Sequence, residues 1–111
     1  MDCLFCKIAL KEIPSKVVLE TDDIFAFHDI SPQAPVHVLI IPKKHIATLD
    51  ELDESSHSIM GKLTYTASKI AKEMKLEGYR LVFNNREIAG QSVFHIHCHL
   101  LGGRPMNWPP G

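Results

Sequence analysis

Apolar residues along this chain fall into several short runs and one longer stretch with helical spacing. The short runs are rich in β-branched and aromatic residues and are bounded by turn formers, which predicts strands at 16–20, 24–28, 36–41, 79–84 and 93–101. From 55 to 76 apolar residues recur every three or four positions, which predicts one long helix that Gly78 can end. Residues 6–12 predict a short helix that stops before Pro14.

Strands on both sides of one long helix are typical of an α+β fold, in which an antiparallel sheet carries the helix on one face. We therefore expect a five-stranded antiparallel sheet, one long helix and a short N-terminal helix. No repeat or linker interrupts the chain, so its 111 residues predict a single domain over 1–111. One face of the sheet is left to carry chemistry.

Composition and charge narrow the function classes. Hydrophobic residues make up 45% and charged residues 23%, as in ordinary globular proteins. The formal net charge of -1 provides no overall positive field, so we expect neither nucleic acid nor a membrane surface as a partner. Without a long apolar run or a leader pattern, the chain is expected to be soluble and cytoplasmic. Three cysteines, an odd number, argue against a disulfide framework.

Histidines occupy every second position of the last predicted strand: His95, His97 and His99. Because side chains alternate across a strand, the three imidazoles should share one face, with Ile96 and Cys98 on the other. Neighbouring imidazoles repel when all are charged, which favours mixed protonation states near neutral pH. The pattern indicates an acid/base or ligand array.

The triad and its surroundings resemble the histidine triad (HIT) family, whose signature is His-φ-His-φ-His-φ-φ, with φ apolar. Four further segments look like the Hint branch of that family: 27–35 (FHDISPQAP), 41–45 (IPKKH), 90–95 (GQSVFH) and the tail 102–111. The resemblance covers nearly the whole chain. It implies a HIT-like fold whose sheet continues across a homodimer.

By that resemblance, His97 is the nucleophile that attacks an α-phosphate and forms a covalent nucleotidyl-histidine, which water then hydrolyses. His99 would contact the phosphate and help to protonate the leaving atom. Ser92 would lie near a leaving nitrogen, and His37 would lie close behind the triad, where it could orient the other histidines. His95 completes the catalytic set that the resemblance implies.

The resemblance also implies a nucleotide pocket. Asp29 would accept hydrogen bonds from two ribose hydroxyls, since a carboxylate offers two oxygens. The purine would lie among Ile13, Phe27, His28 and Ile30. The phosphate would lie near Asn84 and the segment Gly90, Gln91, Ser92 and Val93. Trp108, in the tail, would reach toward the active site of the partner subunit. The tail would influence which leaving group is preferred, and Asn107 stands where some relatives have histidine.

Two metal sites are consistent with the sequence. In the first, His95, His97 and His99 bind a catalytic zinc. In the second, Cys3 and Cys6 form a Cys-x-x-Cys pair that His45 and His95 complete as a closed structural zinc site, as some relatives in the family imply. We favour the second site, which leaves His97 and His99 for chemistry and requires no catalytic cofactor. The alternative is that Cys3 and Cys6 are plain reduced thiols.

The function that these residues imply is a homodimeric purine nucleoside phosphoramidase. It would cleave the P–N bond of nucleoside 5′-phosphoramidates and release AMP or GMP. A hydrolase of dinucleoside polyphosphates or adenylyl sulfate would use the same array and is the closest alternative. A nucleotide-binding regulatory protein is the alternative from another class.

Overall fold

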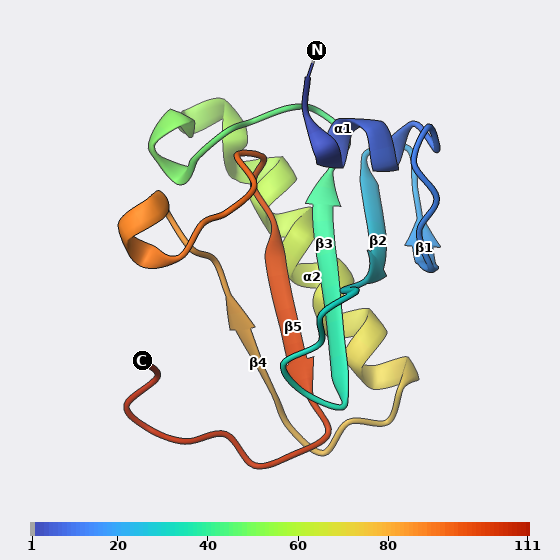
Figure 1. Cartoon of the computed structure of the whole chain (residues 1–111), viewed down its shortest axis with the longest axis vertical. Coiled ribbons are helices and arrows are strands. Elements are labelled where there is room, and N and C mark those ends of the chain that lie inside the picture. The colour runs from blue at the N-terminus through green and yellow to red at the C-terminus, as the bar shows by residue number, and fades with distance from the viewer. Residues whose placement is uncertain (1) are drawn as a thin grey trace.

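A five-stranded antiparallel sheet forms the centre of the molecule. The computed structural model describes residues 2–111. Its strands are β1 (Val17–Glu20), β2 (Ile24–His28), β3 (Val36–Pro42), β4 (Tyr79–Val82) and β5 (Cys98–Gly102), in the spatial order β1-β2-β3-β5-β4 (Figure 1). The order places β5, which carries His99, between β3 and β4, and leaves β1 and β4 at the edges.

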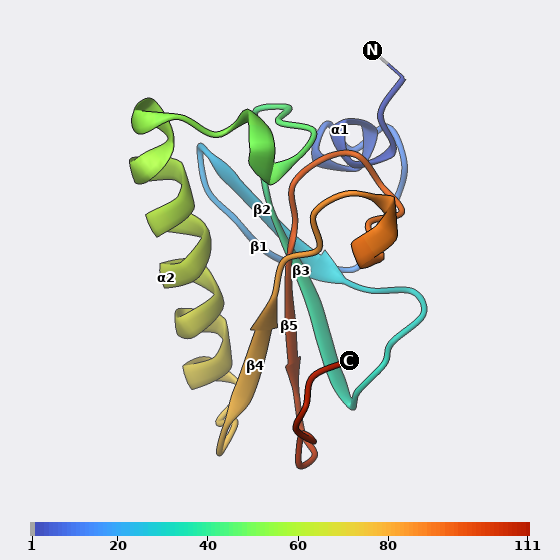
Figure 2. The same ribbon diagram turned by 90° about the vertical axis from the view of Figure 1, so that its left-hand side faces the viewer.

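One face of the sheet is covered by the long helix α2 (His57–Glu73), as Figure 2 shows. The buried side of α2 presents Leu63, Ala67 and Ile70 to a core that includes Ile96 and Leu100. A helix of this length is stabilised mainly by such packing. No helix in residues 2–111 combines the length and apolar character needed to cross a bilayer.

The opposite face carries the short helix α1 (Leu4–Ala9) and the loop that contains the 3₁₀ turn η3 (Glu87–Ala89) (Figure 2). Two further 3₁₀ turns, η1 (Leu49–Glu51) and η2 (Glu54–Ser56), precede α2. Phe5 and Ile8 of α1 pack on Phe27, Leu39 and other apolar side chains of the sheet. The two faces are therefore different: α2 seals one, and a thinner layer leaves room for a site on the other.

Both predicted helices have different bounds in the structure. α1 begins at Leu4 instead of residue 6, because the Cys3 side chain caps it by accepting the N–H of Cys6, and it ends before Lys11, whose φ is 64°. α2 ends at Glu73, and the left-handed residue after it is Lys75 (φ 57°), not the predicted Gly78.

The last predicted strand was wrong at its start: β5 begins at Cys98, not at residue 93. Its partner β3 ends at Pro42, which has no N–H to offer. The Pro42 carbonyl instead accepts a hydrogen bond from the ring of His95, and the N–H of Ile96 donates to Ile46. Residues 93–97 therefore lead into β5 without pairing with β3 as a strand.

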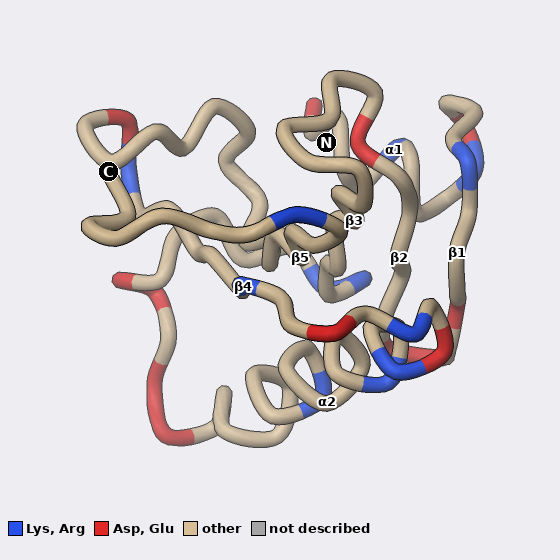
Figure 3. Tube along the Cα trace, turned by 90° about the horizontal axis from the view of Figure 1, so that it is seen from below, with Lys and Arg blue, Asp and Glu red and all other residues tan. Residues whose placement is uncertain are grey.

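Charged residues of both signs are interspersed along the described chain (Figure 3). Ion pairs join several of them, including Lys43 with Glu20 and Lys62 with Asp23. Exposed pairs of this kind contribute little to stability. The interspersed charges agree with the small net charge, and neither positive nor negative charge dominates the surface.

Candidate active site and metal centre

The three histidines of the triad share one face, but they serve two different clusters. Ile96, Cys98 and Leu100 point into the core beneath α2, as the alternation predicts. On the other face, the His97 and His99 rings lie side by side, with centroids 4.8 Å apart. His95 is fully buried and turns toward His45, with ring centroids 5.1 Å apart.

The tautomer of His97 is set by the backbone. Its Nδ1–H donates to the carbonyl oxygen of His95 at 2.8 Å, which leaves the lone pair on Nε2. Burial lowers the pKa of His97 below its ordinary value, so the ring is neutral at pH 7. An edge-to-face contact with the ring of Phe5 also holds the His97 ring in place, with centroids 5.0 Å apart and 89° between the ring planes. His97 thus presents a neutral, nucleophilic Nε2.

A relay of hydrogen bonds fixes the tautomer of His99 in the opposite sense. The backbone N–H of Gln33 donates to Nδ1 of His37 at 3.0 Å, so in the neutral ring the proton of His37 is on Nε2. That proton points at Nδ1 of His99, 2.9 Å away. His99 must then carry its own proton on Nε2, a buried atom with no partner among the described residues. His99 therefore offers a donor beside the nucleophile.

Burial keeps both members of the relay neutral. Burial, followed by repulsion from the His97 and His37 rings when these are protonated, lowers the pKa of His99 to about 4. Burial also lowers the pKa of His37, although Asp29 opposes the shift. The 3.5 Å contact between His37 Nε2 and Asp29 is therefore a polar contact with a neutral ring at pH 7 rather than a full ion pair.

A pocket of about 660 Å³ opens over His97 and His99. Most of the residues predicted to bind a nucleotide line it: Ile13, Phe27, His28, Asp29, Ile30, Gly90, Ser92, Val93, His97 and His99. His37 lines it as well. Residues from six separate parts of the chain meet here, on the face of the sheet that α2 does not cover.

Three lining residues come from α1 and were missed by sequence reasoning: Leu4, Phe5 and Ile8. The predicted helix began at residue 6, which left Leu4 and Phe5 outside it. Leu4 and Phe5 are one helical turn before Ile8, so a helix that begins at residue 4 places all three apolar side chains on one side. This spacing is the signal in the sequence that could have found them. Phe5 also packs edge-on against Phe27, at 5.5 Å between centroids, so α1 and β2 form one aromatic wall.

Asp29 lies at the end of β2, on the rim of this pocket. Its Oδ1 accepts the backbone N–H of Ser31 at 2.7 Å, which holds the carboxylate in place. The side chain is partly exposed, at 19%, so a ligand can reach it. A fixed and accessible carboxylate suits the recognition of neighbouring hydroxyl groups.

The loop before the triad is braced by Gln91, whose buried side chain bonds three backbone groups. It accepts from the N–H of Arg86 and donates to the carbonyls of Ala47 and Val93. The N–H groups of Gly90 and Gln91 bond within the loop. Of the loop residues that line the pocket, Gly90 has its N–H bonded within the loop, whereas Ser92 and Val93 have N–H groups without a hydrogen bond in the described chain. Gln91 thus shapes the loop and does not line the pocket.

Two other predicted residues lie off the pocket wall. Asn84 lies behind Gly90, where an added Cβ would come within 3.7 Å of its side-chain nitrogen. Trp108 is 81% exposed, and the Arg80 guanidinium lies 6.0 Å from its ring. In a single chain the tail therefore follows the β4 edge, away from its own pocket.

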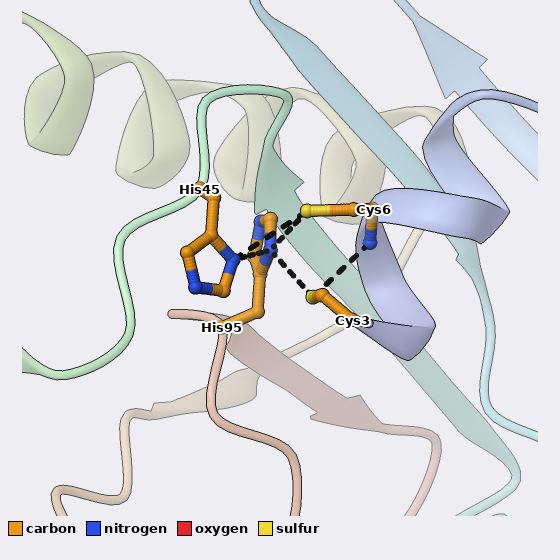
Figure 4. A group of neighbouring side chains, drawn as sticks. All are labelled: Cys3, Cys6, His45 and His95. Carbon is orange, nitrogen blue, oxygen red and sulfur yellow. Dashed lines mark hydrogen bonds between the residues drawn. The ribbon is translucent and has the colours of Figure 1, made fainter. Parts of the chain in front are cut away.

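Cys3, Cys6, His45 and His95 come together, as predicted for the structural zinc site (Figure 4). Nδ1 of His95 lies 3.4 Å from Cys3 Sγ, 3.5 Å from Cys6 Sγ and 3.2 Å from His45 Nδ1. Tetrahedral zinc with ordinary bond lengths separates two ligand nitrogens by about 3.3 Å and a nitrogen from a sulfur by about 3.5 Å. The donor atoms therefore already stand at the spacing that such an ion requires.

The protonation of His95 supports the same fit. Its Nε2–H donates to the carbonyl of Pro42 at 2.7 Å, which places the lone pair on Nδ1, among the sulfurs. Burial, then the contact with Cys3, raises the pKa of Cys6 to about 11, so without a cation this thiol stays protonated. Two thiols and two imidazoles, one of them oriented by a carbonyl, form a donor set that suits zinc.

Asp29, His37 and His99 form a second cluster of metal-ligand types, but its tautomers oppose metal binding. Gln33 donates to Nδ1 of His37, so Nε2 carries a proton and has no lone pair for an ion. The proton between His37 and His99 occupies the place that a metal would take. This cluster is built to hold protons, and the triad as a whole is not a three-histidine zinc site because His95 faces elsewhere.

Comparisons with known proteins agree with this geometry. Residues 10–106 match the HIT domain. The chain is 52% identical over 113 residues to a "14 kDa zinc-binding protein" of Brassica juncea, covering 99% of this chain and 100% of that one. It is also 52% identical over 111 residues to "Adenylylsulfatase HINT1" of Arabidopsis thaliana, covering 97% of this chain and 76% of that one.

Two solved structures show the same fold. A HIT family hydrolase from Legionella pneumophila Philadelphia 1 matches with a TM-score of 0.97 at 54% identity, covering 99% of this chain and 100% of that one. A histidine triad protein from Clostridium difficile matches with a TM-score of 0.93 at 41% identity, covering 96% and 95%. The chain belongs to the HIT domain family, which confirms the resemblance, and it is a hydrolase.

Proposed function

We propose that this hydrolase cleaves the P–N bond of purine nucleoside 5′-phosphoramidates and releases AMP or GMP and an amine. The observation that carries the proposal is the pairing of opposite tautomers in one pocket. His97 offers a lone pair on Nε2, and His99 beside it offers a proton on Nε2. A nucleophile next to a donor is what displacement at a phosphorus atom requires.

The reaction proceeds in two displacements. Nε2 of His97 attacks the α-phosphorus, the new P–N bond to the ring forms, and the bond to the amine breaks as the amine takes up a proton. Water then attacks the same phosphorus, the bond to His97 breaks, and the nucleotide leaves. The neutral state of His97 at pH 7 suits the first step, because a charged imidazole has no lone pair on Nε2.

His99 supplies the hydrogen bond to the phosphoryl oxygens. In the ligand-free site its pKa of about 4 keeps it neutral, so it donates Nε2–H without being a strong acid. An anionic phosphate in the pocket opposes that lowering and draws the relay toward the protonated state, in which His99 can pass a proton to the leaving amine. His37 holds His99 in the required tautomer.

Ser92 and Asp29 complete the site in this proposal. The exposed Ser92 hydroxyl lies on the pocket wall, where it can bond the departing nitrogen, and its N–H and that of Val93 can bond the phosphate. Asp29 accepts hydrogen bonds from the ribose hydroxyls. The aromatic and aliphatic wall of Phe5, Phe27 and Ile13 encloses the base.

The test is hydrolysis of adenosine 5′-phosphoramidate and of a fluorogenic adenylated amine by wild type and His97→Ala. We expect release of AMP by wild type and a loss of at least about a thousandfold in the variant. Trapping of radiolabelled AMP on the wild-type chain in acid-free denaturant would detect the covalent intermediate. Tight binding of AMP by wild type with no release from any substrate would instead favour a nucleotide-binding regulatory protein.

A second substrate class is supported by the name of a relative. The Arabidopsis thaliana relative is called an adenylylsulfatase, which points to adenylyl sulfate. Dinucleoside polyphosphates are a further candidate, because the same α-phosphorus is attacked and only the leaving group differs. Parallel measurement of kcat/KM on P–N, P–O–S and P–O–P substrates ranks the three.

We also propose that zinc occupies the cluster of Cys3, Cys6, His45 and His95. When bound, the ion supplies a cross-link between the N-terminus and the sheet, and the chemistry above takes place without it. Metal analysis of the purified protein tests the ion, with one equivalent expected. For assembly, we propose a homodimer that continues the sheet, because β4 is an edge strand. Light scattering tests this proposal.

A further inference from the structure

The helix α1 takes part in two sites at once. Cys3 caps the helix and Cys6 lies in its first turn, and both sulfurs face His95 (Figure 4). Leu4 and Phe5, which stand between these cysteines in the sequence, line the pocket. One short helix therefore supplies half of a metal centre and one wall of the nucleotide pocket.

Little else fixes the position of α1. A helix of six residues is marginal on its own, since nucleation costs more than so few hydrogen bonds return. The backbone hydrogen bonds of α1 within the described chain close among residues 3–13. The helix is held to the sheet by burial of Phe5 and Ile8, which are 5% and 8% exposed, and by its two cysteines.

The metal centre also lies one step from the nucleophile. His95 contributes its ring to the cluster and its carbonyl oxygen to Nδ1 of His97. The ring of Phe5 packs against both histidines, with centroids 6.1 Å from His95 and 5.0 Å from His97. A change at the metal centre can therefore reach His97 in the pocket through two residues, His95 and Phe5.

We propose that metal binding at the Cys3–Cys6–His45–His95 centre sets the nucleotide affinity of the pocket, with Cys3, Cys6 and His45 acting as positioning residues for the α1 wall. The centre would then be a coupled site and not only a stabilising cross-link. The proposal rests on the proposed function in one respect, that the pocket holds a purine mononucleotide. Coupling between two sites is reciprocal, so a bound nucleotide must raise the affinity for zinc by the same factor.

The experiment measures AMP binding by titration calorimetry in three proteins: zinc-loaded wild type, chelator-treated wild type and Cys6→Ala. We expect AMP to bind about tenfold more weakly after removal of zinc, and Cys6→Ala to match the chelated wild type with or without added zinc. The reciprocal titration, with zinc in a competing chelator, should show about tenfold tighter zinc binding when AMP is saturating.

Two further variants distinguish the contribution of the α1 pocket wall from that of the metal ligands. Cys98→Ala removes a buried cysteine from the far face of the sheet, and it should leave both affinities as in wild type. Phe5→Leu should weaken AMP binding while zinc stoichiometry stays at one. Hydrogen exchange at residues 4–9, followed by mass spectrometry, should be faster in the chelated protein and slower again after zinc is restored.

The outcomes distinguish this inference from the proposed function. Equal AMP affinity with and without zinc, or an absence of zinc binding, overturns the coupling while leaving phosphoramidate hydrolysis intact. Failure of zinc-loaded wild type to bind AMP at all overturns the proposed nucleotide pocket, and the coupling with it. Matching shifts in the two reciprocal titrations support the proposal, because a cross-link that acts on stability alone does not produce them.

Discussion

Acid should destabilise this fold through His99. The pKa of His99 is about 4 in the folded protein, against 6.5 for an unperturbed histidine. Between these values the unfolded chain binds a proton that the folded chain does not, so stability rises with pH across this window. The contribution is complete above pH 6.5, and it is progressively lost as the pH falls toward 4.

The magnitude follows from the shift and from the position of the ring. At about 1.4 kcal/mol per unit, the full shift corresponds to about 3 kcal/mol. His99 is only partly buried, and water screens part of this penalty. We therefore expect His99 to account for roughly 1–2 kcal/mol of the stability lost between pH 7.5 and pH 4.5.

The assay is urea denaturation of wild type and His99→Gln at both pH values, with the loss of stability compared between the two proteins. The glutamine retains a polar side chain of similar reach and removes the titration. The variant should lose about 1–2 kcal/mol less than wild type on acidification. Equal losses in the two proteins, or an NMR titration of the His99 ring near 6.5, would refute the neutral relay on which the proposed mechanism depends.

Three further changes test the site, its loop and the core. Ser92→Ala should slow P–N hydrolysis by at least about tenfold in steady-state assays and leave the melting temperature unchanged, because the hydroxyl is exposed and can reach the leaving group; an unaltered rate would remove Ser92 from the mechanism. Gln91→Ala should cost about 1–3 kcal/mol in urea denaturation, since it orphans buried backbone groups. Leu63→Ala should cost about 2–5 kcal/mol and leave kcat unchanged, since this side chain of α2 is fully buried between the helix and the sheet; a large drop in kcat would contradict the separation of the two faces.

The strand and helix pattern was readable because it is local. β2 has the predicted bounds, and β3 differs only by the inclusion of Pro42. Alternation in the triad correctly placed Ile96 and Cys98 on the face opposite the histidines, where they join the core. The predicted start of β5 was wrong because its pairing depends on where β3 ends. The pocket-lining residues at the start of α1 were missed because the helix is capped by a cysteine, which is not one of the usual capping residues.

Local patterns along the chain therefore predicted the type and order of the elements, the shared face of the histidines and a Cys-x-x-Cys pair, since each depends on residues that are close in sequence. The division of the triad between two clusters follows from contacts that form only in the folded chain. Cys3 meets a ring 92 positions away in His95, and that same residue's carbonyl fixes His97. The N–H of Gln33 sets the proton positions in His37 and His99. These assignments depend on backbone groups that are brought together only by folding, and a tautomer is set by its hydrogen-bond partner rather than by residue type.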